Sequence, residues 1–259
     1  MEISLHAFRC LVDYQFDGED RIQKQHEFLT DIGINTDFSN EVSNNIHSKC
    51  KELGLSGWVI SPFWEPTTGE SWYNTWYDLL KSGNSQKIGE YFKENNYHLL
   101  NCIRGYVRFE IENYSWWIEA EKLFDCKSYL GCAFILSALL EREIRKCPID
   151  NWRYRTTQYF KDSISDKITQ IYTDDTIEPI NRYVDTLLLI PSLEGFIKSF
   201  FNSGYTFENG VEPTFVERNW LMHGLTNRVV SAEDCIKLFN ANGSLRYVLT
   251  TLFGTDYRQ

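Results

Sequence analysis

An arginine, an asparagine and a histidine stand close together in the C-terminal part of this sequence. They are Arg218, Asn219 and His223, within the run Pro213 to Gly224, Pro-Thr-Phe-Val-Glu-Arg-Asn-Trp-Leu-Met-His-Gly. A guanidinium makes paired contacts with phosphate oxygens, and a histidine takes or gives a proton near neutral pH. Together they predict chemistry on a phosphodiester, with the imidazole as base or acid and the arginine stabilising the charge that develops.

RNA is the substrate that suits such a set of residues, because its own 2′-hydroxyl attacks the neighbouring phosphate. Cleavage then needs a base for that hydroxyl, an acid for the departing 5′-oxygen and positive charge for the phosphorane. This chemistry requires no metal ion, and we expect no cofactor. The seven cysteines include no C-x-x-C pair, so the sequence predicts no zinc site either.

A short helix is expected to position these side chains. Thr214 followed three residues later by Glu217 is a capping-box pattern, which predicts a helix from about Phe215. His223 would then lie near the end of this helix. Gly224 would be its C-cap or a point of close packing.

The spacing of Arg218 and His223 raises a geometric question. Five residues along an α-helix turn through about 500°, so the two side chains would lie roughly 140° apart around the axis. They therefore do not share one face of a regular helix. Either Arg218 reaches around from the first turn, or two copies of the chain pool their residues.

The pattern Arg218-Asn219-x3-His223-Gly224 resembles the HEPN superfamily, helical proteins named for higher-eukaryote and prokaryote nucleotide binding. The resemblance covers about the C-terminal two-thirds of the chain. It implies a metal-independent endoribonuclease, a toxin or antiphage effector, in which the motifs of two protomers meet in one cleft. It thus implies a homodimer formed through the Arg218–His223 helix, with Asn219 orienting the arginine or the phosphate. An antitoxin would be a further partner.

The strongest helical pattern in the chain runs from about Tyr129 to Lys146, after a predicted cap at Ser128. Apolar residues nearly surround its first half, which predicts burial on several sides. Its last turns resemble the long helix that packs beside the Arg…His helix in HEPN proteins. By that resemblance, Glu141 or Glu143 would approach the site.

A basic stretch follows, in which Trp152 and Tyr154 are interleaved with five cations: Arg142, Arg145, Lys146, Arg153 and Arg155. One interpretation is an RNA-binding edge that tracks phosphates and offers rings for base stacking. The other is that basic residues end helices because they complement the helix dipole. The sequence leaves both interpretations open.

Apolar spacing elsewhere predicts an all-α fold, with a HEPN-like helical bundle at residues 91–259. Residues 1–90 are predicted to be a mainly helical or irregular region that is rich in aromatic residues and whose role the sequence does not define. Its tryptophans, Trp72 and Trp76 among them, are either a stacking platform for a ligand or part of the core. Aromatic residues at helical spacing favour the core.

Charge and composition narrow the function classes. The net charge of −10 argues against a general nucleic-acid coat protein, although an acidic protein can still hold a local basic groove. The scattered cysteines favour reduced thiols in the cytoplasm. No apolar run is long enough to cross a bilayer, and Met1 to Leu5 lacks the start of a secretion signal, so we expect a cytoplasmic protein without membrane contact.

Three hypotheses follow. The first is the endoribonuclease, and the second is a module that binds RNA or a nucleotide in the same groove without cutting. The third is a helical assembly protein with a structural motif, in which Arg218 pairs with Glu217 or another acid and His223 caps a helix end. Exposure of Arg218 and His223 in a cleft separates the third hypothesis from the other two.

Overall fold

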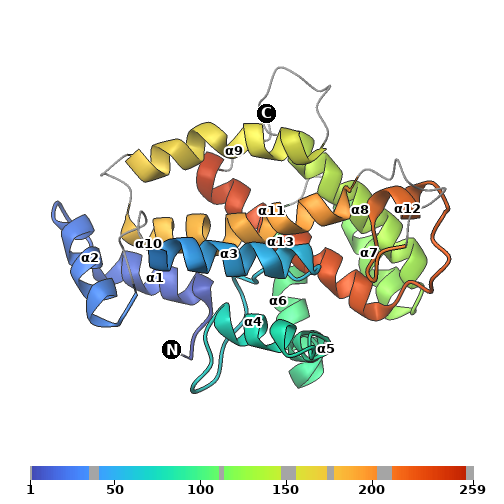
Figure 1. Ribbon diagram of the computed structural model, residues 1–259, viewed down its shortest axis with the longest axis horizontal. Helices are drawn as coiled ribbons and strands as arrows, with labels where there is room; N and C mark the ends of the chain where they lie inside the picture. The colour runs from blue at the N-terminus through green and yellow to red at the C-terminus, as the bar shows by residue number, and fades with distance from the viewer. Residues whose placement is uncertain are drawn as a thin grey trace.

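The computed structural model describes residues 2–34, 41–110, 114–146, 156–173, 178–202 and 212–254. Every regular element within these ranges is a helix, which confirms the predicted all-α class. The elements are α1 Leu5–Gln15, α2 Arg21–Asp31, α3 Glu41–Leu55, α4 Asn74–Lys81, α5 Gln86–Tyr91, α6 Glu94–Glu110, α7 Tyr114–Asp125, α8 Tyr129–Arg145, α9 Thr156–Thr173, α10 Pro179–Asn181, the π-helix η1 Arg182–Leu189, α11 Ile190–Phe200, α12 Arg218–Met222 and α13 Ala232–Phe253 (Figure 1).

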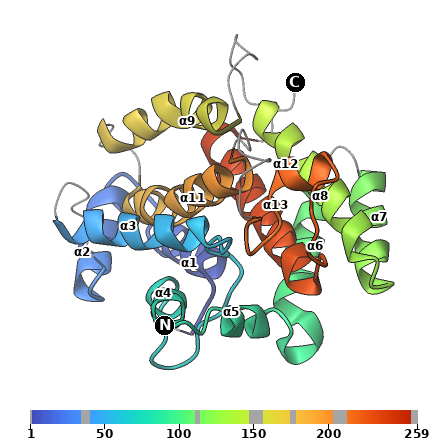
Figure 2. The same ribbon diagram turned by 45° about the vertical axis from the view of Figure 1, so that its right-hand side comes forward.

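Helix α13 is the central element of the fold. Every residue from Asp234 to Leu249 is buried, and Figure 2 shows this helix between α11 and α8. It begins in a capping box formed by Ser231 and Asp234. Two of its buried polar side chains, Asn240 and Ser244, bond to backbone of the loop after α3. Asn240 Nδ2 donates to the carbonyl of Val59 at 2.6 Å.

The predicted N-terminal and C-terminal regions pack against each other without a gap in the apolar core. Helices α3 and α11 cross so closely that a Cβ atom on Gly54 would lie 1.9 Å from the carbonyl oxygen of Ser192. A Cβ atom on Gly195 would lie 2.1 Å from the carbonyl oxygen of Lys51. The boundary near residue 90 stays a prediction, but the two sides of it share one core.

The aromatic residues of the N-terminal region belong to that core. Trp58, Trp72 and Trp76 are buried, and the rings of Trp58 and Trp76 meet edge to face with centroids 6.4 Å apart. Phe92 packs against both of these rings. The core interpretation of these tryptophans is therefore confirmed, and none of the three offers an open stacking face.

Candidate functional site

Helix α12, which carries the Arg-Asn-x3-His motif, begins at Arg218 rather than near Phe215. The capping box predicted for Thr214 and Glu217 is therefore wrong. Glu217 is itself the N-cap, and its buried carboxylate accepts a hydrogen bond from the backbone N–H of Trp220 at 2.9 Å. Burial raises the pKa of Glu217, although the hydrogen bonds from Trp220 and Asn219 oppose the shift.

The other end of α12 carries a Schellman motif. Gly224 has a φ of 69°, and its N–H donates to the carbonyl of Leu221 at 3.1 Å. The N–H of Leu225 reaches the carbonyl of Trp220 at 2.9 Å, which completes the motif. Gly224 thus ends the helix. Close packing is not its role, because a Cβ atom at this position would meet nothing within 4 Å. His223 is the C-cap residue and is exposed.

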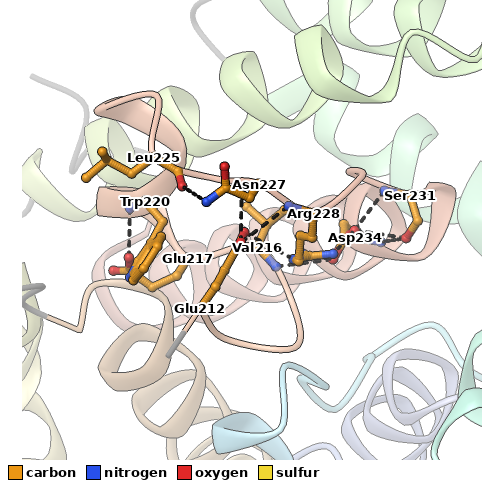
Figure 3. Close-up of polar contacts among 9 residues, drawn as sticks. All are labelled: Glu212, Val216, Glu217, Trp220, Leu225, Asn227, Arg228, Ser231 and Asp234. Carbon is orange, nitrogen blue, oxygen red and sulfur yellow. Dashed lines mark hydrogen bonds and ion pairs between the residues drawn. The ribbon is translucent and has the colours of Figure 1, made fainter. Parts of the chain in front are cut away.

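The segment before and after α12 is tied to the start of α13 (Figure 3). Glu212 accepts hydrogen bonds from the N–H groups of Asn227 at 3.0 Å and Arg228 at 3.3 Å, which joins the two ends of the segment. Arg228 in turn donates to both oxygens of Asp234, at 3.0 and 2.6 Å. This clamp holds the segment with the motif to the central helix.

Asp234 is the residue of α13 that accepts the hydrogen bonds of this clamp. It also accepts from the backbone N–H of Val216 at 3.2 Å, which keeps the chain extended where a first helical turn was predicted. Burial disfavours its charged form, but the bonds from Arg228 and from the Ser231 backbone outweigh that effect and lower the pKa of Asp234. Neither Glu212 nor Arg228 was identified as important in the sequence, because their partners lie in other turns of the chain.

Arg218 is held by a carboxylate from α8. Its Nε and Nη2 atoms lie 3.1 and 3.0 Å from Oε2 of Glu141. The other oxygen of Glu141 lies 3.2 Å from Nε of Arg145. The Arg218 and Glu141 side chains keep 27% and 22% of their surface exposed, so the pair is open to solvent. The predicted pairing of Arg218 with an acid is therefore present, but with Glu141 rather than Glu217.

Asn219 lies between this pair and the backbone. Its Oδ1 accepts from Nη1 of Arg218 at 3.2 Å, so it fixes the direction of the guanidinium. Its Nδ2 donates to the carbonyl of Asn202 at 2.8 Å and to the carboxylate of Glu217 at 3.2 Å. The asparagine therefore links α12 to the end of α11, which neighbours it in the fold.

A pocket of about 320 Å³ opens between α8 and α12, and we call it the guanidinium pocket. Three guanidinium groups and one carboxylate carry its charge, and its lining consists of Ser137, Ala138, Glu141, Arg142, Arg145, Arg218 and Met222. It is a local basic site in an acidic chain, of the kind that phosphate binding needs. His223 does not belong to this lining, so the structure brings Arg218 together with the basic end of α8 and leaves the histidine outside.

The other predicted site residues lie elsewhere. Glu143 is buried and forms an ion pair with Arg246 of α13, so Glu141 alone of the two carboxylates contacts Arg218. Nζ of Lys146 lies 3.8 Å from Glu143 and thus on that side of α8. Arg153 and Arg155 lie outside the described residues.

The described ranges contain neither a cluster of metal ligands nor a membrane span. In the described ranges, no three His, Cys, Asp or Glu side chains converge as ligands of a metal ion. No helix of those ranges is long and apolar enough to cross a membrane. Comparison of the chain with protein-family models, with curated proteins and with solved structures gives no match. The function is therefore argued from the guanidinium pocket and the residues around it.

Proposed function

We propose that the chain is a metal-independent endoribonuclease of the HEPN kind and that the guanidinium pocket receives the RNA backbone. The observation that carries the proposal is that Arg218 and Arg145 share Glu141 on the wall of a pocket with three guanidinium groups. A phosphodiester placed there competes with Glu141 for Arg218 and Arg145. Because guanidinium groups bind phosphate oxygens in pairs, the pocket suits a strand rather than a single uncharged molecule.

The residues then take distinct roles. Arg218 stabilises the negative charge of the phosphorane, and Asn219 orients the guanidinium of Arg218. Arg142 and Arg145 hold neighbouring phosphates, and Arg153 and Arg155 are proposed as further RNA contacts, whereas Lys146 lies on the side of Glu143 and takes no part. Glu141 orients Arg218 before RNA arrives, and Glu143 supports α8 from within the core.

His223 is the base or acid of the proposed reaction, and it requires a second copy of the chain. It lies at the exposed end of α12, while Arg218 faces the pocket at the start of the helix. Three apolar side chains within six residues of it in the sequence are open to solvent: Met222 at 40%, Leu225 at 37% and Val229 at 87%. Exposed apolar side chains in the segment that carries a charged site favour a protein contact. In a homodimer through α12, the histidine of one protomer completes the pocket of its partner.

A biological role as a toxin or antiphage effector in the cytoplasm, held in check by an antitoxin, is part of the same proposal. It rests on the resemblance of the Arg218-Asn219-x3-His223-Gly224 pattern to HEPN proteins. The alternative function is a module that binds RNA or a nucleotide in the guanidinium pocket without cutting. One observation favours it, namely that His223 is not among the residues that line the pocket.

The deciding experiment is cleavage of end-labelled single-stranded RNA in the presence of EDTA. We expect wild type to cut and to leave 2′,3′-cyclic phosphate ends. We expect His223→Ala to cut at least about 100-fold more slowly. His98→Ala, which removes another exposed histidine from a distant helix, is the matched control and should cut like wild type. Equal cutting by wild type and His223→Ala would reject the catalytic assignment. Binding without any cutting by wild type would support the alternative.

A further inference from the structure

A second pocket, lined by none of the residues of the guanidinium pocket, lies where α6, α7 and the start of α8 meet. It has a volume of about 410 Å³, within the range of small-molecule sites. Its lining includes Tyr97, Asn101, Arg104, Asp125, Lys127 and Tyr129. We call it the α6–α7 pocket. Its charged residues give +1, from Arg104 and Lys127 against Asp125, in a chain whose net charge is −10.

Arg104 is the unusual member of this lining, because its charge is buried and only partly satisfied. Its side chain is 9% exposed, and Nη1 donates to Oδ1 of Asp125 at 3.2 Å. Its Nε and Nη2 atoms are buried and have no hydrogen-bond partner among the described residues. An anion in the pocket therefore acts on the charge of this guanidinium, not through a bond to its buried edge. A buried cation with an unused edge is costly, so an anion in the pocket would stabilise it.

Aromatic rings surround this cation. The centre of the Arg104 guanidinium lies 4.8 Å from the ring centroid of Phe124 and 4.9 Å from that of Phe239. Phe124 also contacts the rings of Tyr97 and Tyr129 edge to face, at 6.1 and 5.6 Å between centroids. The rings of Tyr97 and Tyr129 thus line the pocket beside a cation, which suits a planar ligand that carries a negative charge.

The backbone around the pocket is strained. The non-glycine residues with positive φ in the described ranges are Asn95, Asn96, Tyr97 and Lys127, and the last three of them line the pocket. A left-handed conformation costs an L-residue about 1–2 kcal/mol. Strained backbone of this kind gathers at sites that hold a ligand.

We propose that the α6–α7 pocket binds a small organic phosphate or carboxylate that carries a planar ring. The anion lies against Arg104 and Lys127, and the ring lies against the tyrosines. Asp125 forms an ion pair with the guanidinium of Arg104, and its side chain is 64% exposed, so the contact is weak and is easily exchanged for the ligand. Asp125 therefore competes with the ligand, whereas Lys127 supports it.

Titration calorimetry of the full chain tests the proposal with phenyl phosphate and benzoate, and with phenol and inorganic phosphate as the separate halves. We expect at least one ring-bearing anion to saturate one site per chain, about tenfold more tightly than either half. Asp125→Asn should tighten this binding and Lys127→Gln should weaken it, each by about fivefold. Because the two charge changes act in opposite directions, a loss of folding cannot imitate the pair of results.

The matched controls are Glu119→Gln and Lys122→Gln, which remove the same charges from exposed positions of α7 outside the pocket. The proposal is overturned if neither phenyl phosphate nor benzoate saturates a site. It is equally overturned if Asp125→Asn and Lys127→Gln bind like wild type, or like their controls.

Discussion

Arg218 of α12 and Glu141 of α8 are joined across the wall of the guanidinium pocket, with Nε and Nη2 of the arginine at 3.1 and 3.0 Å from one carboxylate oxygen. This contact positions the arginine while it leaves both side chains partly exposed. An ion pair of that kind contributes at most about 1 kcal/mol to stability, so it is easily exchanged. The same carboxylate that orients Arg218 is thus the competitor that a phosphate must displace.

Removal of that competing charge should strengthen RNA binding. We expect Glu141→Gln to bind a labelled single-stranded RNA about fivefold more tightly at low salt, because the lining of the pocket then loses its carboxylate, the partner of Arg218. Fluorescence anisotropy measures the affinity, and Glu119→Gln on the exposed face of α7 is the control for the overall change in charge. Unchanged affinity in Glu141→Gln, or an equal gain in the control, would contradict the placement of RNA in this pocket.

Two inactive variants should restore activity when mixed, if each site takes residues from both protomers. Arg218→Ala and His223→Ala are each expected to be inactive alone. Half of the dimers in an equal mixture then carry one variant of each kind and one intact site, so activity returns to about a quarter of wild type. The RNA cleavage assay follows the recovery after the two proteins have exchanged subunits.

The same mixture has a built-in control. Val229→Asp places a charge at an exposed apolar position of the α12 segment, six residues after His223, so we expect it to keep the chain monomeric and abolish the recovery. Sedimentation equilibrium reports the mass. No recovery from a mixture that is shown to be dimeric would mean that Arg218 and His223 do not complete each other across an interface.

Local signals in the sequence predicted the helices whose ends depend on nearby residues. The apolar run after Ser128 predicted α8 at Tyr129, and the capping box of Ser231 and Asp234 is a local signal of the same kind at the start of α13. Capping boxes and apolar spacing act within a few residues, so the chain encodes them where they occur. The role of Gly224 as the left-handed residue directly after the C-cap follows the same logic, since such a turn favours a glycine locally.

Contacts between distant segments decided what the sequence missed. The chain before α12 stays extended because Val216 bonds to Asp234 from another element, so the local cap at Thr214 is not used. The central place of α13 was hidden for a similar reason. Asn240 and Asn242 are typical of an exposed face, but they are buried and donate to the carbonyls of Val59 and Leu136.

The sequence named four residues of the guanidinium pocket as candidates, Glu141, Arg142, Arg145 and Arg218, but did not predict their arrangement. Glu141 and Glu143 are two residues apart on α8 and so point about 200° apart around its axis. The packing of α8 against α13 decides between them. Glu143 pairs with Arg246 of α13, so Glu141 is the carboxylate that pairs with Arg218. The sequence holds no signal for that choice, because either face of the helix end carries both acids and bases.

The clamp between Arg228 and Asp234 should make the α12 segment sensitive to acid. The folded-state pKa of Asp234 lies below its usual value of 3.8, so its contribution to stability is present above that value and is lost as pH falls through the folded-state pKa. Asp234→Asn should therefore lower the free energy of unfolding at pH 7 by about 1–3 kcal/mol. Urea denaturation at pH 7 and near pH 3.5 should show a smaller difference from wild type at the acidic pH.

The control for Asp234→Asn is Glu212→Gln. It weakens the contact between the two ends of the segment but leaves the ion pair of Arg228 with Asp234 in place. Limited proteolysis of the native protein then separates local from global effects. Asp234→Asn should speed cleavage around residue 228, whereas Asp78→Asn at an exposed position of α4 should not. An equal loss of stability at both pH values in Asp234→Asn would show that the charge of this carboxylate is not what holds the clamp.

The buried pair of Arg9 and Asp185 predicts a pH dependence of the opposite sign. Nη2 of Arg9 lies 3.3 Å from Oδ2 of Asp185, whose side chain is 1% exposed. Burial raises the pKa of Asp185 from 3.8 to about 6, although the nearby guanidinium opposes the shift. Between these values the folded chain binds a proton that the unfolded chain has released, so the contribution of Asp185 to stability falls as pH rises from about 4 to about 6.

Asp185→Asn removes this titration from the folded state. The difference in unfolding free energy between wild type and Asp185→Asn should therefore fall by on the order of 2–3 kcal/mol across that interval and stay constant above it. Urea denaturation at half-unit steps of pH measures this difference, and Asp78→Asn, at an exposed carboxylate, should show no such trend against wild type. A difference that rises with pH would mean that Arg9 holds Asp185 charged in the folded protein even below pH 6, and that its attraction outweighs the burial of the π-helix in which Asp185 lies.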